Sequence, residues 1–352
     1  MMLFDPMTFF RTTFVLQHTT TRLAASLVML AVLLMAAAPV QAQLQQNTIS
    51  ETCTSCYPTS SDSADVNDDG ITDVVVASRD DGKGKILWYE NDGSGGFTPH
   101  TVTSDAGIPP SIRTADVDGD GDPDIVAVQR QLDVFSDRIV WYENDGSPAD
   151  GEWTAQILDQ TYPFSSGAIR VGDLNGDGAI DIVTVVNGEV GWYENEGGGA
   201  FAEKAVIDDN TGVSDAFLAD IDGDGAIDIV ASNPVTASSE PVIWLENDGS
   251  GSFSSPMTIT SEVSGHQSSY GDQSLFAADI DGDGDKDVLS VSADSGRTIE
   301  WYENDGNPSD GSWTTHTVTN SFFKPEVIFV ADVNDDGAMD VVAGGEDDVQ
   351  LY

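Results

Sequence analysis

DVDGDGDPD, residues 116–124, recurs along this 352-residue chain with most of its acidic positions unchanged. Successive copies start 51, 57, 47, 59 and 53 residues apart. Repetition at a period of about 50 residues is typical of architectures built from one supersecondary unit, such as propellers. The other copies are DVNDDGITD at 65–73, DLNGDGAID at 173–181, DIDGDGAID at 220–228, DIDGDGDKD at 279–287 and DVNDDGAMD at 332–340.

Each copy lies in a unit that predicts four short strands. A short run such as 274–278 precedes the acidic string, and a β-branched run such as 182–186 follows it. A third segment, WYENDG or a close variant, comes next, and a Thr/Val run such as 317–319 closes the unit. Gly, Asp and Asn turns join these segments, as expected between strands. The third segments lie at 88–93, 141–146, 192–197, 244–249 and 301–306.

We therefore predict an all-β fold, a β-propeller of four-stranded blades over residues 43–352. A stacked solenoid is the alternative, although solenoid repeats are typically shorter and carry fewer strands. Residues 47–50 align with the run before the second acidic string and are expected to form an outer strand, whereas 349–352 align with the third strand of a sixth unit. Pairing the two ends would complete six blades and cover two sheet edges. Seven blades are expected instead if the chain is a fragment of a longer protein.

The first 42 residues have the pattern of a secretory signal peptide. Arg11 and Arg22 precede an apolar run at 23–38, and small residues at Val40 and Ala42 favour cleavage before Gln43. The alternative is a membrane anchor, but the run is shorter than the roughly 20 residues that a spanning helix needs. We expect the mature chain to be secreted, at the cell surface or outside the cell, with no membrane span.

The chain is strongly acidic, with a formal net charge of −48. The signal segment holds Asp5, Arg11 and Arg22, a net of +1, so the remaining 310 residues carry −49. Such a surface repels nucleic-acid phosphates and anionic membranes, and bound cations or a saline medium would limit its self-repulsion. We expect no nucleic-acid partner, and a monomer.

The two cysteines, Cys53 and Cys56, lie just after the signal segment. In a secreted chain this spacing favours a local disulfide. Such a bond would constrain one terminus, but the fold would not depend on it. A metal pair or a redox site is the alternative.

The acidic string, numbered 1 to 9, has the composition of a calcium loop. Side-chain oxygens occupy positions 1, 3, 5 and 9, Gly at position 6 permits a sharp turn, and the carbonyl at position 7 is expected to face inward. Merely solvated turns are the alternative, and magnesium is disfavoured by an all-protein oxygen cage. The expected ligands are Asp65, Asn67, Asp69, Ile71 and Asp73; Asp116, Asp118, Asp120, Asp122 and Asp124; Asp173, Asn175, Asp177, Ala179 and Asp181; Asp220, Asp222, Asp224, Ala226 and Asp228; Asp279, Asp281, Asp283, Asp285 and Asp287; and Asp332, Asn334, Asp336, Ala338 and Asp340.

The strings resemble the FG-GAP/VCBS repeat family, whose best-known members form the head of integrin α chains. The resemblance covers about 47–352, and it implies a β-propeller with calcium held between the first and second strands of a blade. The chain lacks clear F-G and G-A-P tripeptides and carries W-Y-E-N-D-G instead, so it is more similar to the bacterial secreted branch.

Binding is expected over catalysis, because few reactive residues depart from the repeat. His100 and His316 occupy equivalent positions and are interpreted as structural, whereas His266, with Tyr270 and Asp272, lies in an insertion at 261–274. We expect a calcium-dependent scaffold for adhesion or for an extracellular glycan or protein ligand. The alternative is a propeller-based polysaccharide lyase or hydrolase, since secreted propellers also host such enzymes.

Overall fold

The computed structural model describes residues 56–80, 83–131, 136–162, 167–186, 188–208, 213–232, 242–260, 275–292, 298–321, 325–333, 336–345 and 349–352. Several expectations lie outside these ranges. They are the signal segment, the closing strand at 47–50, one half of the disulfide, the insertion with its histidine, and one metal ligand: residues 1–42, 47–50, Cys53, His266, Tyr270, Asp272 and Asn334.

The described residues form six antiparallel sheets, five with four strands and one with three. The first three sheets contain β1 (Cys56–Asp62), β2 (Val74–Asp80), β3 (Lys83–Asn91) and β4 (Phe97–Thr103); β5 (Ile108–Ala115), β6 (Asp124–Gln131), β7 (Ser136–Glu143) and β8 (Thr154–Tyr162); and β9 (Ala168–Gly172), β10 (Asp181–Val186), β11 (Glu189–Tyr193) and β12 (Ala205–Asp208). The last three contain β13 (Asp215–Ala219), β14 (Asp228–Ser232), β15 (Val242–Leu245) and β16 (Met257–Thr260); β17 (Leu275–Ala278), β18 (Asp287–Ser292), β19 (Thr298–Glu303) and β20 (Thr314–Thr319); and β21 (Pro325–Ala331), β22 (Asp340–Gly345) and β23 (Val349–Leu351).

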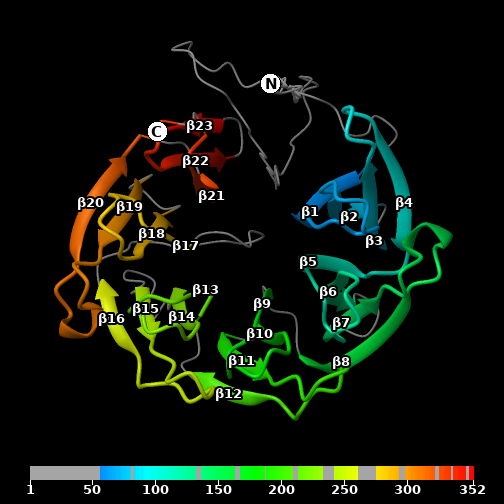
Figure 1. The fold of residues 1–352 in the computed structure, drawn as a ribbon, viewed down its shortest axis with the longest axis horizontal. Helices are drawn as coiled ribbons and strands as arrows, with labels where there is room; N and C mark the ends of the chain where they lie inside the picture. The colour runs from blue at the N-terminus through cyan, green and yellow to red at the C-terminus, as the bar shows by residue number, and fades with distance from the viewer. Residues whose placement is uncertain are drawn as a thin grey trace, which may run out of the picture.

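The sheets are arranged as the blades of a propeller (Figure 1). Strands pair in chain order within each blade, with the first strand nearest the centre and the fourth at the rim. This confirms the predicted all-β propeller, and β23 confirms the third strand expected near the end of the chain. Among the described residues, no helix is long and apolar enough to cross a bilayer.

The apolar core lies between blades. One buried cluster joins Val75 and Trp88 of the first blade to Ile112 and Ile125 of the second. In the second to fifth blades, the aromatic residue after the W-Y-E-N turn packs on a cluster shared with the preceding blade, as Trp153 does on this one. Because one blade leaves both sheet faces apolar, stacking against its neighbours is what buries them. The equivalent aromatic residues in the next three blades are Phe201, Phe253 and Trp313.

Candidate metal sites

The acidic strings lie where the first strand of a blade turns into the second. In the second blade, Ala115 ends β5 and Asp124 begins β6, and these two residues pair across the sheet. Positions 1 to 8 therefore form the turn, and position 9 is the first residue of the second strand. Since the W-Y-E-N turn connects the third and fourth strands, it lies at the same end of the blade as the acidic string.

The first aspartate of each string closes the turn on itself. Asp65 accepts a hydrogen bond at Oδ2 from the Gly70 N–H, 2.7 Å away, and Oδ1 accepts one from the Asp69 N–H at 3.0 Å. The same bond from the glycine at position 6 to position 1 forms in all six strings. Gly70 has a φ of +82°, a conformation in which glycine is favoured.

The ninth-position aspartate fastens the string to the sheet. Asp124 is fully buried; its Oδ2 accepts a bond from the Val117 N–H at 2.9 Å and its Oδ1 accepts one from the Asn144 N–H at 2.7 Å. In the first blade, Trp88 Nε1 also donates to Asp73 Oδ2, at 2.9 Å. These bonds hold one carboxylate against the acidic string on one side and the W-Y-E-N segment on the other.

Burial makes these carboxylates costly to ionise. It raises the pKa of Asp124 to about 7 and the pKa values of Asp228 and Asp287 to about 6, although backbone hydrogen bonds lower them. Burial is also the main reason why the pKa values of Asp118 and Asp222, at position 3, are raised. A divalent cation placed among such groups would favour their charged forms.

Three strings bring carboxylates together closely enough to hold a metal ion. In each, oxygens from positions 1, 3 and 9 lie within 4.8 Å of one another, and the ninth position is buried. These are the three strings with Asp at position 3. The groups are Asp116, Asp118 and Asp124; Asp220, Asp222 and Asp228; and Asp279, Asp281 and Asp287.

Position 5 lies outside the three carboxylate groups. Asp120 is not part of the group that joins positions 1, 3 and 9, and its Oδ1 accepts a bond from the Asp122 N–H at 3.0 Å. In the first string, Asp69 likewise accepts a bond from the Ile71 N–H, at 2.8 Å. The fifth side chain thus helps to shape the turn through a short local bond typical of Asp, and its expected role as a metal ligand stays a prediction.

The glutamate of W-Y-E-N also reaches the acidic string, which the sequence analysis missed. Asn67 Nδ2, at position 3, lies 3.4 Å from Glu90 Oε1, and Asn175 Nδ2 lies 3.1 Å from Glu194 Oε1. The glutamate thus adds a carboxylate beside the third position. Its recurrence in all five W-Y-E-N segments was the available signal.

The asparagine of W-Y-E-N connects neighbouring blades, a role that the sequence analysis also missed. Asn144 Nδ2 donates to the carbonyl oxygen of Val66, position 2 of the preceding string, at 3.0 Å. The same bond joins each later pair of described neighbours up to the fifth blade: Asn195 to Val117, Asn247 to Leu174 and Asn304 to Ile221, at 2.7, 2.7 and 2.9 Å.

The two repeat histidines have structural contacts, as predicted. His100 stacks on Trp88 with ring centroids 4.3 Å apart, and its Nε2 lies 2.9 Å from Glu90 Oε2. His316 stacks on Trp301 at 4.2 Å in the same way. Both rings cover an indole on the outer part of a blade.

The acidic strings lie in residues that match the model of a known repeat family. Residues 65–127, 173–231, 235–290 and 279–343 match the model of the FG-GAP-like repeat, and together they cover more than half of the chain. The chain belongs to the FG-GAP repeat family. All six acidic strings of this FG-GAP protein lie wholly within the matched residues, including the three that gather carboxylates.

Solved structures share the fold of this FG-GAP chain. An Agrocybe aegerita lectin that recognises non-reducing terminal N-acetylglucosamine is 20% identical, with a TM-score of 0.56 over 84% of this chain and 80% of that one. A Lactobacillus plantarum protein is 14% identical, with a TM-score of 0.56 and the same coverage. A Penicillium chrysogenum α-L-arabinanase complexed with arabinobiose is 10% identical, with a TM-score of 0.53 over 84% and 93%. No curated protein matches the sequence significantly.

Proposed function

We propose that this FG-GAP propeller is secreted after cleavage near Ala42, holds a structural calcium ion in the acidic string of each blade, and binds extracellular glycans as an adhesion scaffold. The observation that carries the metal assignment is the convergence of positions 1, 3 and 9 in three strings. The sequence of residues 1–42 supports secretion.

Calcium suits these groups because their donors are hard oxygens without nitrogen or sulfur. In the second string, Asp116, Asp118 and Asp124 would hold the ion, the last from its position at the start of β6. The bound ion would supply charge neutralisation, replacing repulsion among carboxylates by attraction to a common centre. It would also join the turn to the second strand of the blade.

A glycan ligand is supported by the comparisons and by the character of the fold. The Agrocybe aegerita protein is a lectin and the Penicillium chrysogenum protein was solved with arabinobiose, so this kind of propeller can accept sugars. Those likenesses concern the fold, and fold alone does not assign a ligand. We propose binding without turnover, because the described histidines stack on tryptophan in two equivalent blades and so follow the repeat.

The proposal is tested with purified protein saturated with calcium. A glycan array should give binding that EDTA removes and added calcium restores. The same preparation should release no reducing ends or unsaturated sugars from a panel of neutral and acidic polysaccharides. Turnover would favour the hydrolase or lyase alternative, and an empty array together with no turnover would reject the glycan assignment.

A further inference from the structure

Six side chains occupy the same register on the innermost strands. Each lies three residues before its acidic string, and each pairs with the second residue after the ninth-position Asp, as Arg113 does with Val126 and Phe217 with Val230. The first strands of the blades surround the centre of the ring (Figure 1), so residues at this shared register lie at one level around it. In blade order they are Asp62, Arg113, Arg170, Phe217, Phe276 and Phe329.

The last three of these residues form an aromatic row. Phe217 and Phe276 have ring centroids 4.9 Å apart, and Phe276 and Phe329 are 5.6 Å apart in an edge-to-face contact. All three are half-buried, so part of each ring faces solvent. Continuous aromatic surface of this kind is apolar and offers ring faces for stacking.

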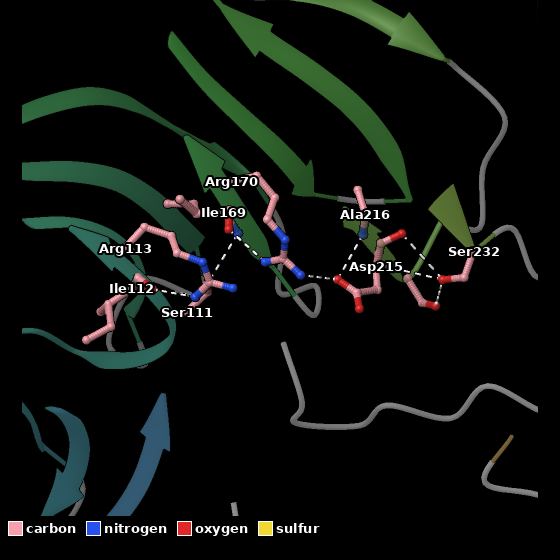
Figure 2. Close-up of polar contacts among 9 residues, drawn as sticks. Ser111, Ile112, Arg113, Ile169, Arg170, Asp215, Ala216 and Ser232 are labelled. Atoms are coloured by element: carbon pink, nitrogen blue, oxygen red, sulfur yellow. Dashed lines mark hydrogen bonds and ion pairs between the residues drawn. The ribbon is translucent and has the colours of Figure 1, made fainter. Parts of the chain in front are cut away.

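The first three are charged and make hydrogen bonds or an ion pair with their surroundings. Asp62 Oδ2 accepts bonds from the N–H and the hydroxyl of Thr114 at 2.8 and 3.1 Å. Arg170 NH2 lies 2.6 Å from Asp215 Oδ1, and both residues are buried (Figure 2). Arg113 NH1 donates to the Ile112 carbonyl oxygen at 2.6 Å, and this arginine remains half-buried.

The polar contacts have a structural reason. The first strand of each blade is a sheet edge. Its N–H and C=O groups that point away from the second strand therefore need other hydrogen-bond partners. Arg113 and Arg170 each donate a hydrogen bond to the carbonyl oxygen of the residue before them in the chain. The Ser111 hydroxyl accepts a bond from the Ile169 N–H at 3.0 Å (Figure 2). Blades four to six place phenylalanine at the same register, so the edge requirement alone does not explain why the ring is divided into a charged half and an aromatic half.

We propose that this level of the ring binds one sugar residue of the glycan, with its C–H face on the phenylalanines and its hydroxyl or carboxylate oxygens toward Arg113. This inference rests on the proposed function and names the place where the ligand is recognised. Ligand sites combine apolar and aromatic walls with a few well-placed polar groups, as this register does. The planar guanidinium suits paired oxygens, including those of a uronate.

Calorimetric titration of the calcium-loaded protein with tetragalacturonate and with cellotetraose tests the proposal. Arg113→Gln and Phe276→Leu should each weaken binding about tenfold, a loss of about 1.4 kcal/mol. The matched controls Arg138→Gln and Phe253→Leu change half-buried residues away from this register and should leave the affinity within about twofold. If the protein binds tetragalacturonate more tightly, and Arg113→Gln weakens only that binding, Arg113 contacts a carboxylate of the sugar. If Arg113→Gln weakens the binding of both sugars equally, Arg113 contacts hydroxyl groups.

Thermal unfolding of every variant in calcium separates recognition from folding. If Phe276→Leu lowers Tm strongly, Phe217→Leu and Phe329→Leu replace it, since each removes part of the same aromatic row. Sugar binding that is as strong in the variants as in the controls would overturn this site while leaving glycan binding intact. Failure of the unmodified protein to bind either sugar, when other glycans on the array do bind, would overturn the site in the same way. An array without any binding would reject the proposed function itself.

Discussion

Asn144 donates from Nδ2 to the carbonyl oxygen of Val66, a residue 78 positions earlier and in the preceding blade, at 3.0 Å. The Val66 N–H donates to Asp73, and the Asn144 N–H donates to Asp124. One buried asparagine thus connects the ninth-position carboxylates of two successive acidic strings. Because three later blade pairs repeat the bond, the strings are linked in series along the ring.

Replacing this asparagine should weaken the interface between blades. Asn144→Ala leaves the buried carbonyl of Val66 and the half-buried carbonyl of Pro123 without the amide that now donates to both. We expect a loss of about 1–3 kcal/mol in the free energy of unfolding, measured by urea denaturation in calcium. Asn307→Ala, at an exposed position, is the control and should cost less than about 0.5 kcal/mol. Equal losses in the two variants would contradict the interface role.

Removing one ligand should have opposite effects with and without calcium. Asp222 belongs to the group with Asp220 and Asp228, and burial raises its pKa. Asp222→Ala should therefore lower Tm in calcium, because one ion loses a ligand, yet leave Tm unchanged or higher in EDTA, because repulsion is relieved. The control is Asp248→Ala, an exposed turn residue of the same blade. A similar loss of Tm in both media would show that Asp222 acts without an ion.

The ion-free protein should lose stability as pH rises from about 4 to about 7. The raised pKa values of Asp124, Asp228 and Asp287 mean that the folded state holds protons in this window which the unfolded chain has already released. Calcium replaces those protons, so its apparent affinity should fall as pH drops below about 6. Urea unfolding in EDTA at pH 5 and pH 7.5, with calcium titrations at both, measures the two effects. Greater ion-free stability at pH 7.5 than at pH 5 would contradict the sign.

A glycine in the fourth blade should be intolerant of any side chain. A Cβ on Gly251 would lie 2.3 Å from a ring carbon of Trp192 in the third blade, and its φ is +77°. Gly251→Ala therefore adds a clash between blades to the strain of a left-handed backbone. Gly249→Ala is the control for backbone strain alone: its φ is +79°, and an added Cβ would have its nearest contact at 3.7 Å, so no clash arises. Unfolding measurements should give a loss of about 1 kcal/mol for Gly249→Ala and a clearly larger one for Gly251→Ala.

Much of this arrangement was predictable because the repeat is regular. The positions of the acidic strings predicted where the first strand of each blade ends and the second begins. The ligand pattern also correctly grouped Asp116, Asp118 and Asp124 as neighbours. The local bond of the fifth position was not predicted, since Asp120 accepts it within its own turn and this depends on backbone geometry; its role as a ligand stays a prediction.

The contacts between blades were harder to predict, because they join residues far apart in the chain. Asn144 and Val66 meet through the rotation that relates two blades, which a pattern read within one unit does not contain. The division of the inner ring was visible in principle, since aligning the units on their acidic strings places Arg113 and Phe276 in one column.

Calcium stoichiometry, determined by equilibrium dialysis and elemental analysis and paired with thermal unfolding in EDTA, tests the central claim most directly. The account predicts about six ions per chain, one for each acidic string, and a Tm that falls markedly when they are removed. A protein that retains no calcium and melts at the same temperature in chelator would contradict it.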